Sequence, residues 1–332
     1  MGKIRIVDRT LSCLDSYSPT GEQLLELISL FMLGDADCLE LSVRAFRILG
    51  ELPCYGSFVL RISSPEEAVK YPMFDKFVCP RTADETHFVY AELPLNDVSD
   101  QTLITRHQND RIIRIAGLDT LFRQKVVTSL SYLKAFLPKN NEFAPGNSCG
   151  CAVAAAMEWI NAGCGNTIVT SFSGVGDQAP FEEVLIASRH IFRRHPQTNY
   201  EYLPRMREIM EEILGREFAR NKPVIGTGIF TVESGIHIGG IRKHPKCYEL
   251  YPPETVGQER TFSYGKFSGR VSIRHKLKEM GYEVTEEELN RITDVIKAVS
   301  TEKIRPVTEN ELIDLIGHCL RGAKYEGEAT EH

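Results

Sequence analysis

Short apolar segments alternate with longer segments of helical period over the first two thirds of the chain. Short runs rich in Val, Ile, Leu and Phe are typical of buried strands in a parallel sheet. We expect eight strands, at Ile4–Val7, Cys38–Leu41, Phe58–Ile62, Lys76–Cys79, Phe88–Leu93, Arg111–Ile115, Glu142–Phe143 and Thr167–Phe172.

Segments with apolar residues three or four positions apart lie between these strands, for example Thr20–Leu33, Gln124–Phe136 and Cys151–Ala162. Strands that alternate with helices favour a parallel sheet, and eight of them predict an α/β fold of the (β/α)8 TIM barrel type. Only about eight residues separate the fourth and fifth strands, so some helices should be shortened. A doubly wound sheet is the alternative, because periodicity alone does not separate the two folds.

The pattern changes after Asn221. Residues 222–270 are rich in Gly, Pro and His with little helical period, which predicts an ordered, loop-rich arm. Helical period returns afterwards, and Thr285 with Glu288 and Thr308 with Glu311 have the spacing of capping boxes. We therefore expect a barrel domain at residues 1–221, an arm at 222–270 and a helical C-terminal subdomain at 271–332.

Composition and charge exclude several classes of protein. The net charge is -6 and the pI about 5.9, which argues against nucleic acid or an anionic membrane as a partner. No apolar run is long enough to span a bilayer and no signal peptide is evident, so we expect a cytoplasmic protein. Nine cysteines include only a C-x-C pair, Cys149 and Cys151, which favours free thiols over disulfides or structural zinc.

The arm carries a long motif. Val224–His237 reads V-I-G-T-G-I-F-T-V-E-S-G-I-H, and Gly265–Arg270 reads G-K-F-S-G-R. This run resembles the homocitrate synthase and 2-isopropylmalate synthase family of the DRE-TIM metallolyase superfamily, which has E-[SA]-G-I-H and G-K-H-S-G at these places. Ala298–Thr301 resembles the nitrogenase-associated homocitrate synthase branch. Weaker likeness continues upstream, at Asp8–Leu11 and Ser173–Asp177.

The resemblance implies a Claisen condensation, in which a 2-oxo acid sits on a divalent metal and the enolate of acetyl-CoA attacks its carbonyl. In the family, the first strand carries T-L-R-D-G-E, with a catalytic arginine and a metal-binding aspartate, and strand seven supplies an H-x-H metal pair. Here Ser12 stands at the arginine position and Cys13 at the aspartate position, and Ala144 and Gly146 stand at the histidine positions. The resemblance therefore implies a degenerate barrel that binds neither metal nor 2-oxo acid.

Two further family positions differ in this chain. Ser173 stands for the strand-eight asparagine, and Leu118 for the strand-six threonine that holds the substrate carboxylate. A substitute metal site near the barrel mouth is the alternative to a lost one, although no spacing in the sequence demands it. Its candidate ligands are Asp8, Cys13, Asp15 and Cys149.

In the family that this chain resembles, the arm of one subunit reaches over the neighbouring barrel, where a histidine and a tyrosine assist acid–base chemistry. The matching residues are His237 and Tyr248. Histidine titrates near neutral pH and so suits proton transfer, whereas Tyr248 is equally consistent with a packing residue. The resemblance also implies that Glu233 and Ser234 shape the turn that holds His237.

Two classes of function follow. The first is a homocitrate synthase-like acyltransferase subunit that supplies its arm in trans to a paralogous catalytic barrel, in a hetero-oligomer linked to nitrogen fixation. Mg, Mn or Zn would then be bound only by the partner, and Lys266 and Arg270 would contact the phosphates of acetyl-CoA unless they merely form a solvated basic loop. The second is a non-catalytic pseudoenzyme or regulatory protein, for example a homodimer. In both cases we expect the isolated chain to be inactive.

Overall fold

The computed structural model describes residues 3–80, 88–96, 98, 112–123, 125–195 and 197–328. The chain divides into two compact units. The barrel unit comprises Met1–Phe218 and Pro223–Ile225, and the arm unit comprises Ala219–Lys222 and Gly226–His332.

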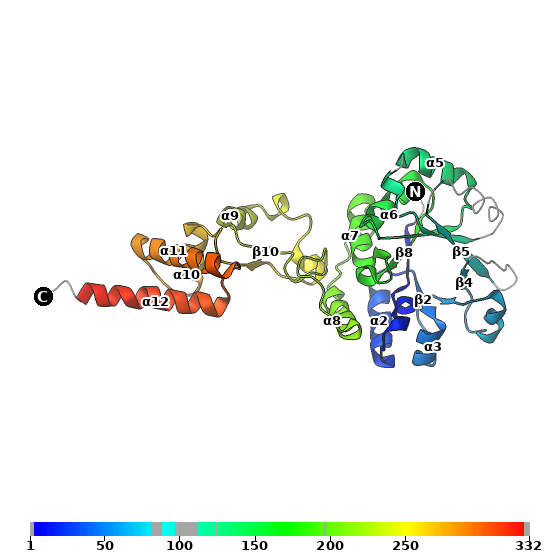
Figure 1. The fold of residues 1–332 in the computed structure, drawn as a ribbon, viewed down its shortest axis with the longest axis horizontal. Coiled ribbons are helices and arrows are strands. Elements are labelled where there is room, and N and C mark those ends of the chain that lie inside the picture. Colours follow the sequence, from blue (N-terminus) through cyan, green and yellow to red (C-terminus); the bar gives the residue numbers. More distant parts are fainter. Residues whose placement is uncertain are drawn as a thin grey trace. The chain divides into compact units, whose positions relative to one another are not determined.

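Among the described residues, eight parallel strands close into a barrel (Figure 1), which confirms the predicted (β/α)8 fold. They are β1 (Arg5–Asp8), β2 (Cys38–Ser42), β3 (Phe58–Arg61), β4 (Phe77–Pro80), β5 (Val89–Leu95), β6 (Ile113–Gly117), β7 (Asn141–Pro145) and β8 (Thr167–Ser171). Each strand pairs with the next, and β8 closes on β1 in a register that pairs Asp8 with Thr170. A short strand, β9 (Ala179–Pro180), lies beside β8.

The ends of the predicted strands shift by one or two residues in the structure, and two of these shifts have a clear cause. Phe172, expected in the eighth strand, lies instead in the 3-10 turn η4 (Phe172–Gly174), where Ser173 has a φ of 56°. Phe88 also has a positive φ, 52°, and β5 begins one residue later. A left-handed backbone conformation does not fit the pleat of a strand, which explains both shifts. Arg111, expected in the sixth strand, lies outside the described residues.

Helices connect the barrel strands, and several are short, as predicted. They are α1 (Thr10–Cys13), α2 (Gly21–Leu33), α3 (Val43–Leu49), α5 (Val126–Phe136), α6 (Ala152–Ala162), α7 (Phe181–Phe192) and α8 (Leu203–Leu214), with 3-10 helices η1 (Leu14–Ser16), η2 (Pro65–Lys70) and η3 (Leu121–Arg123). Between β3 and β4 the only helix is η2, within a fully described connection. Most of the short connection between β4 and β5 lies outside the described residues.

Apolar side chains from most of the strands pack inside the barrel, in a cluster of Val7, Cys38, Val59, Val78, Tyr90, Ala144 and Val169. The lone tryptophan, Trp159 of α6, is fully buried and stacks on Phe143 of β7 with ring centroids 4.2 Å apart. Such a pair contributes about 0.5–1.5 kcal/mol beyond the burial of its area. Trp159 is therefore a core residue, as its helical position predicts.

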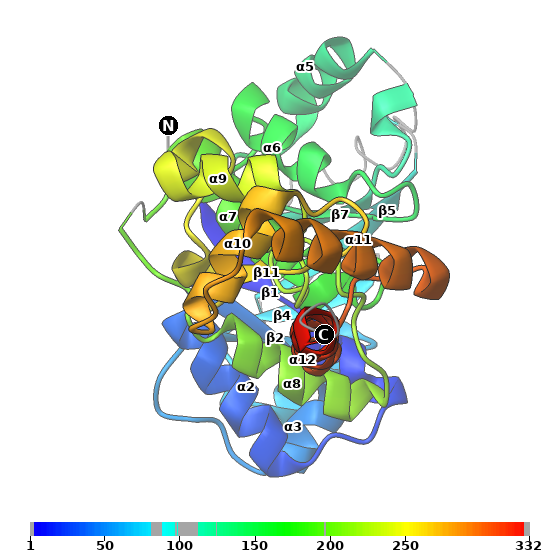
Figure 2. The same cartoon turned by 90° about the vertical axis from the view of Figure 1, so that its left-hand side faces the viewer.

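The arm unit has a core of its own. Its elements are β10 (Thr231–Val232), α9 (Gly235–Lys243), η5 (Pro245–Cys247), η6 (Pro253–Val256), β11 (Thr261–Phe262), α10 (Arg270–Glu279), α11 (Glu286–Lys303) and α12 (Glu309–Glu328). The helix α10 packs against both α9 and α11, and α11 packs against α12 (Figure 2). Tyr264, Ile273, Leu277, Ile292, Ile296 and Ile316 are among the buried residues of this core.

Two sequence predictions for the arm unit have different outcomes. Thr285 and Glu288 form the predicted capping box at the start of α11, and Thr308 and Glu311 exchange the same pair of hydrogen bonds before α12. The expectation of an arm with little helix is wrong at Gly235–Lys243, which forms α9. Two adjacent glycines, Gly239 and Gly240, lower the helical propensity of this segment, which explains why its period is weak.

No helix within the described part of the chain is both long and apolar enough to cross a membrane. The nine cysteines are all free thiols.

Candidate functional site

The C-terminal ends of β6, β7, β8 and β1 are neighbours in the closed barrel. They bring together the positions that correspond to the metal and substrate motifs: Ser12, Cys13, Leu118, Ala144, Gly146 and Ser173. Active sites of (β/α)8 enzymes are built at this end of the strands.

The first-strand residues face the protein interior. Ser12 Oγ lies 2.7 Å from Glu40 Oε1, to which it donates a hydrogen bond. Burial raises the pKa of the Cys13 thiol to about 11, which disfavours the thiolate form that a metal would bind. Burial also raises the pKa of Asp8 to about 7, although Thr10 and Thr170 donate hydrogen bonds to its carboxyl group.

The strand-seven position Gly146 has no room for a side chain. A Cβ built there would lie 2.5 Å from Asp119 Oδ1, well inside van der Waals contact. The Asp119 carboxylate is held in place by Ser148, whose backbone N–H and hydroxyl donate to it at 2.9 and 2.7 Å. Ala144, the other histidine position, is fully buried and carries no ligand atom.

A network of ion pairs fills part of the barrel interior. Its members are Arg9, which directly follows β1, Glu40 of β2, Arg61 of β3, Glu92 of β5, Arg114 of β6 and Glu142 of β7. Arg114 is fully buried and pairs with Glu40, with Glu92 at 3.3 Å and with Glu142 at 2.8 Å. Arg61 pairs with Glu40 at 2.7 Å and with Glu92 at 2.6 Å.

The charges of this network neutralise each other, since it has three arginines and three glutamates. Burial alone would raise the pKa of Glu40, yet the guanidinium groups of Arg114 and Arg61 hold it well below its usual range. Arg9 lies farther out, with Nε 3.7 Å from Glu40 Oε1 and Nη1 3.6 Å from Glu92 Oε2. The positive charges of the interior arginines are thus balanced by glutamates of the same barrel.

The four residues considered for a substitute metal site do not gather. In the described ranges, no three His, Cys, Asp or Glu side chains are grouped so that they could hold a metal ion. Cys149 is exposed, with its Sγ 3.9 Å from Arg123 Nη2.

His237 and Tyr248 form a pair on the surface of the arm unit. His237 is exposed in the first turn of α9, and Tyr248 follows η5 with 49% of its surface exposed. Their ring centroids lie 5.9 Å apart with the planes tilted by 58°. The structure thus brings together the two arm residues that the sequence singled out.

Glu233 and Ser234 link α9 to the Gly265–Gly269 loop. Glu233 Oε1 accepts a hydrogen bond from the backbone N–H of Phe267 at 2.9 Å, and the Glu233 carbonyl accepts one from Ser268 Oγ at 3.3 Å. Ser234 is the N-cap of α9, but its side chain makes no capping hydrogen bond. Glu233 therefore holds the turn through its side chain, and Ser234 through its backbone.

Lys266 and Arg270 are exposed where two helices begin. Arg270 Nη1 donates to Asn290 Oδ1 at 3.2 Å. The starts of α9 and α10 meet here, since a Cβ on Gly235 would lie 3.4 Å from the backbone N of Gly269. Neither helix has an acidic residue in its first turn, so the positive ends of both helix dipoles remain available to an anion.

Comparison with known proteins agrees with the arm motif. Residues 224–304 match the family model described as homocitrate synthase post-HMGL domain-like. Homocitrate synthase AksA of Methanopyrus kandleri is 33% identical over 174 residues, 52% of this chain and 43% of that protein. The homocitrate synthase omega subunit of Clostridium pasteurianum is 33% identical over 175 residues, 52% of this chain and 49% of that protein.

These matches make the chain similar to homocitrate synthases and isopropylmalate synthases over part of its length. It spans about half the length of the curated relatives it matches. Hydroxymethylglutaryl-CoA lyase from Pseudomonas aeruginosa has a TM-score of 0.53 at 11% identity, over 65% of this chain and 94% of that chain. At so low an identity, this likeness supports the TIM barrel fold alone.

The barrel of this chain does not fit the divalent metal that the resemblance implies. Gly146 has no side chain and the Asp119 carboxylate occupies the adjacent space, Ala144 has no ligand atom, and burial disfavours the thiolate form of Cys13.

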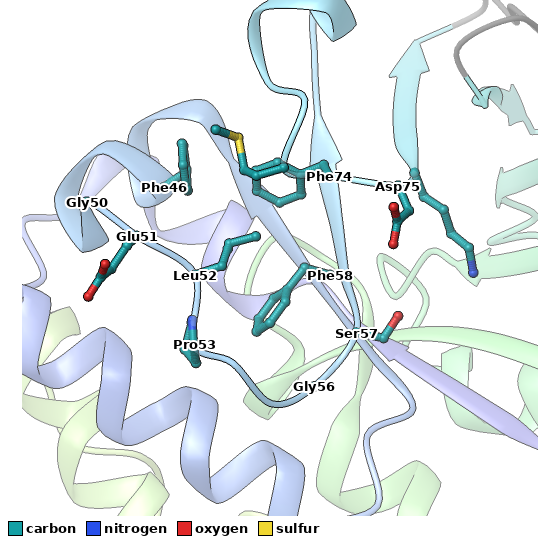
Figure 3. Close-up of a pocket in the computed structure, with 12 residues that line it drawn as sticks. Phe46, Gly50, Glu51, Leu52, Pro53, Gly56, Ser57, Phe58, Phe74 and Asp75 are labelled. Carbon is teal, nitrogen blue, oxygen red and sulfur yellow. The ribbon is translucent and has the colours of Figure 1, made fainter.

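A pocket of about 570 Å³ lies at the opposite end of the barrel, where β3 and β4 begin (Figure 3). Figure 3 shows Leu52, Phe58 and Phe74 turned toward one another across it. The family's site residues belong to the C-terminal ends of the strands or to the arm, so this pocket is separate from the candidate site.

Proposed function

We propose that this chain is a subunit of a homocitrate synthase-type acyltransferase and that its arm completes the active site of a partner barrel. The observation that carries the proposal is an asymmetry between the two units. Gly146 and Cys13 leave the chain's own barrel without fitting metal ligands, whereas His237 and Tyr248 lie together and exposed on the arm. An exposed acid–base pair needs a substrate held by another barrel.

The partner would be a paralogous chain that keeps the T-L-R-D-G-E and H-x-H motifs, and with them Mg, Mn or Zn and the 2-oxo acid. The methyl group of acetyl-CoA loses a proton, its carbon bonds to the ketone carbon, and the ketone oxygen gains a proton. Water then cleaves the thioester and releases CoA. His237 and Tyr248 would move protons in these steps. The name of the Clostridium relative, an omega subunit, supports a homocitrate synthase made of more than one kind of chain.

The surface around this pair suits both CoA and a protein partner. Lys266 and Arg270, beside the converging helix starts, would bind the CoA phosphates. Three large apolar side chains nearby in sequence are highly exposed: Ile236 at 83%, Phe267 at 69% and Val271 at 76%. Their burial against the partner barrel would stabilise the complex.

The test is turnover by the complex reconstituted with the paralogous chain. A positioned acid–base group contributes about 100- to 10,000-fold in rate, so His237→Ala should lower turnover by that order without affecting co-purification. The matched control is His275→Ala, because His275 is exposed on α10 and pairs with Glu279. If the His237→Ala complex assembles and turns over normally, the trans-acting role is wrong and the regulatory pseudoenzyme is the better account.

A further inference from the structure

A forked ion pair lies next to Tyr248 in the chain. Arg260 Nε donates to Glu249 Oε1 at 2.8 Å, and Arg260 Nη2 donates to Glu249 Oε2 at 2.7 Å. The side chain of Glu249 is only 10% exposed and that of Arg260 27%. Two parallel hydrogen bonds between planar groups fix orientation as well as distance, which a single surface ion pair does not.

The fork joins the segment that carries Tyr248 to the segment that leads to His237. Glu249 directly follows Tyr248, and Arg260 directly precedes β11. The strand β11 pairs with β10, which ends at Val232. After β10 the chain reaches α9 and His237 within five residues. The side-chain fork and the strand pair therefore connect the segment of Tyr248 to the segment of His237.

The ring of Tyr248 packs against Gly240 of α9. A Cβ on Gly240 would lie 2.6 Å from Cε2 of Tyr248, so any side chain at this position would displace the ring. Gly240 lies one turn of helix after His237. Without a Cβ at Gly240, the ring can lie against the helix backbone beside the histidine.

We propose that Arg260 is a positioning residue, which acts through Glu249 to hold Tyr248 against Gly240 and beside His237. Arg260 does not itself touch the reacting atoms. Its effect on catalysis rests on the proposed function, whereas its effect on the geometry of the pair is a property of the chain alone.

The geometry is tested first in the isolated chain, by nuclear Overhauser contacts between the rings of His237 and Tyr248. Arg260→Gln should abolish these contacts, and Arg260→Lys should weaken them, because lysine keeps the charge but not the fork. Arg274→Gln is the matched control, since Arg274 pairs with Glu286 at the surface of the same unit, and it should leave the contacts unchanged. Persistence of the contacts in folded Arg260→Gln would overturn the proposal.

The second experiment measures turnover by the complex with the paralogous chain. A displacement of about 1 Å can cost on the order of 100-fold in rate, so Arg260→Gln should lower kcat at least tenfold, with KM for acetyl-CoA changed less than twofold. Glu249→Gln should have the same effect, and the double variant should be no worse than either. If the ring contacts are lost but kcat is unchanged, Arg260 is only structural. If the unaltered complex is inactive, the proposed function fails, and the ring contacts alone decide whether Arg260 positions the pair.

Discussion

At the scale of single residues, Gly146 shows how the barrel mouth departs from a metal site. The space that a side chain would need is taken by the Asp119 carboxylate, which two hydrogen bonds from Ser148 hold in place. A ligand could not be restored there by one substitution, because the carboxylate would have to move as well.

Gly146→Ala tests this crowding. We expect it to destabilise the barrel by about 1–3 kcal/mol, as overpacking does, measured by urea unfolding of the full chain. Adding Asp119→Ala should recover much of the loss, since it removes the carboxylate that the new methyl group meets. Equal stability of Gly146→Ala and the unaltered chain would show that the site is not crowded.

A second prediction concerns Asp8, whose pKa is raised by burial to about 7 from a model-peptide value of 3.8. Between these values the folded chain holds a proton that the unfolded chain has lost, so this carboxyl group lowers stability as pH rises. Asp8→Asn cannot titrate. Its stability relative to the unaltered chain should therefore rise between pH 4 and pH 8, by up to roughly 4 kcal/mol.

Denaturant unfolding at several pH values measures this difference for Asp8→Asn. Asp75→Asn is the control, because Asp75 is exposed at the other end of the barrel. A difference that stays constant from pH 4 to pH 8 would mean that Asp8 does not titrate differently in the folded chain.

At the scale of secondary structure, hydrophobic spacing was sufficient to place the eight strands, and side-chain chemistry placed the capping box of α11. The ion-pair network was missed, although its signal is visible in hindsight. Glu40 and Arg61 each interrupt an otherwise apolar predicted strand, and Arg114 lies between isoleucines in another. A buried charge needs a partner. Which charges meet depends on closure of the barrel, because the partners are 21 residues apart in Glu40–Arg61 and 83 residues apart in Arg9–Glu92.

The network predicts that Arg114→Met strongly lowers the stability of the fold, because methionine has a similar length but no charge. Removing this arginine leaves Glu40, Glu92 and Glu142 with less compensation, and we expect a loss of about 3–5 kcal/mol at pH 8. The loss should be smaller at pH 5, because the pKa values of the uncompensated carboxyl groups rise and their protonated forms are then populated.

Thermal and urea unfolding at the two pH values test this prediction for Arg114→Met. Arg205→Met is a matched control in the same unit, because Arg205 pairs with Glu26 at the surface, and its loss should lower stability far less than the loss of Arg114. Equal effects of the two substitutions would contradict the account of a cooperative buried network.

At the scale of the whole molecule, the evidence for the family is uneven. The matching family model covers residues 224–304, nearly all of them in the arm unit, whereas the solved structures support the barrel at the level of fold. The sequence could identify His237 and Tyr248 because they lie in a contiguous motif. It could not reveal the Glu249–Arg260 fork, since an ordinary acidic and an ordinary basic residue eleven positions apart give no recognisable pattern.

The measurement that tests the central claim most directly is a mixing experiment. The paralogous chain with intact metal motifs, its own arm histidine changed to alanine, is titrated with this chain, and CoA release from acetyl-CoA is followed with a 2-oxo acid present. The account predicts little turnover by either chain alone and a rate that rises with added chain until each partner barrel has received one arm. With His237→Ala in the added chain, the rate should not rise. A rate that is independent of the added chain, or equal with and without His237, would contradict the claim that this chain completes a partner's active site.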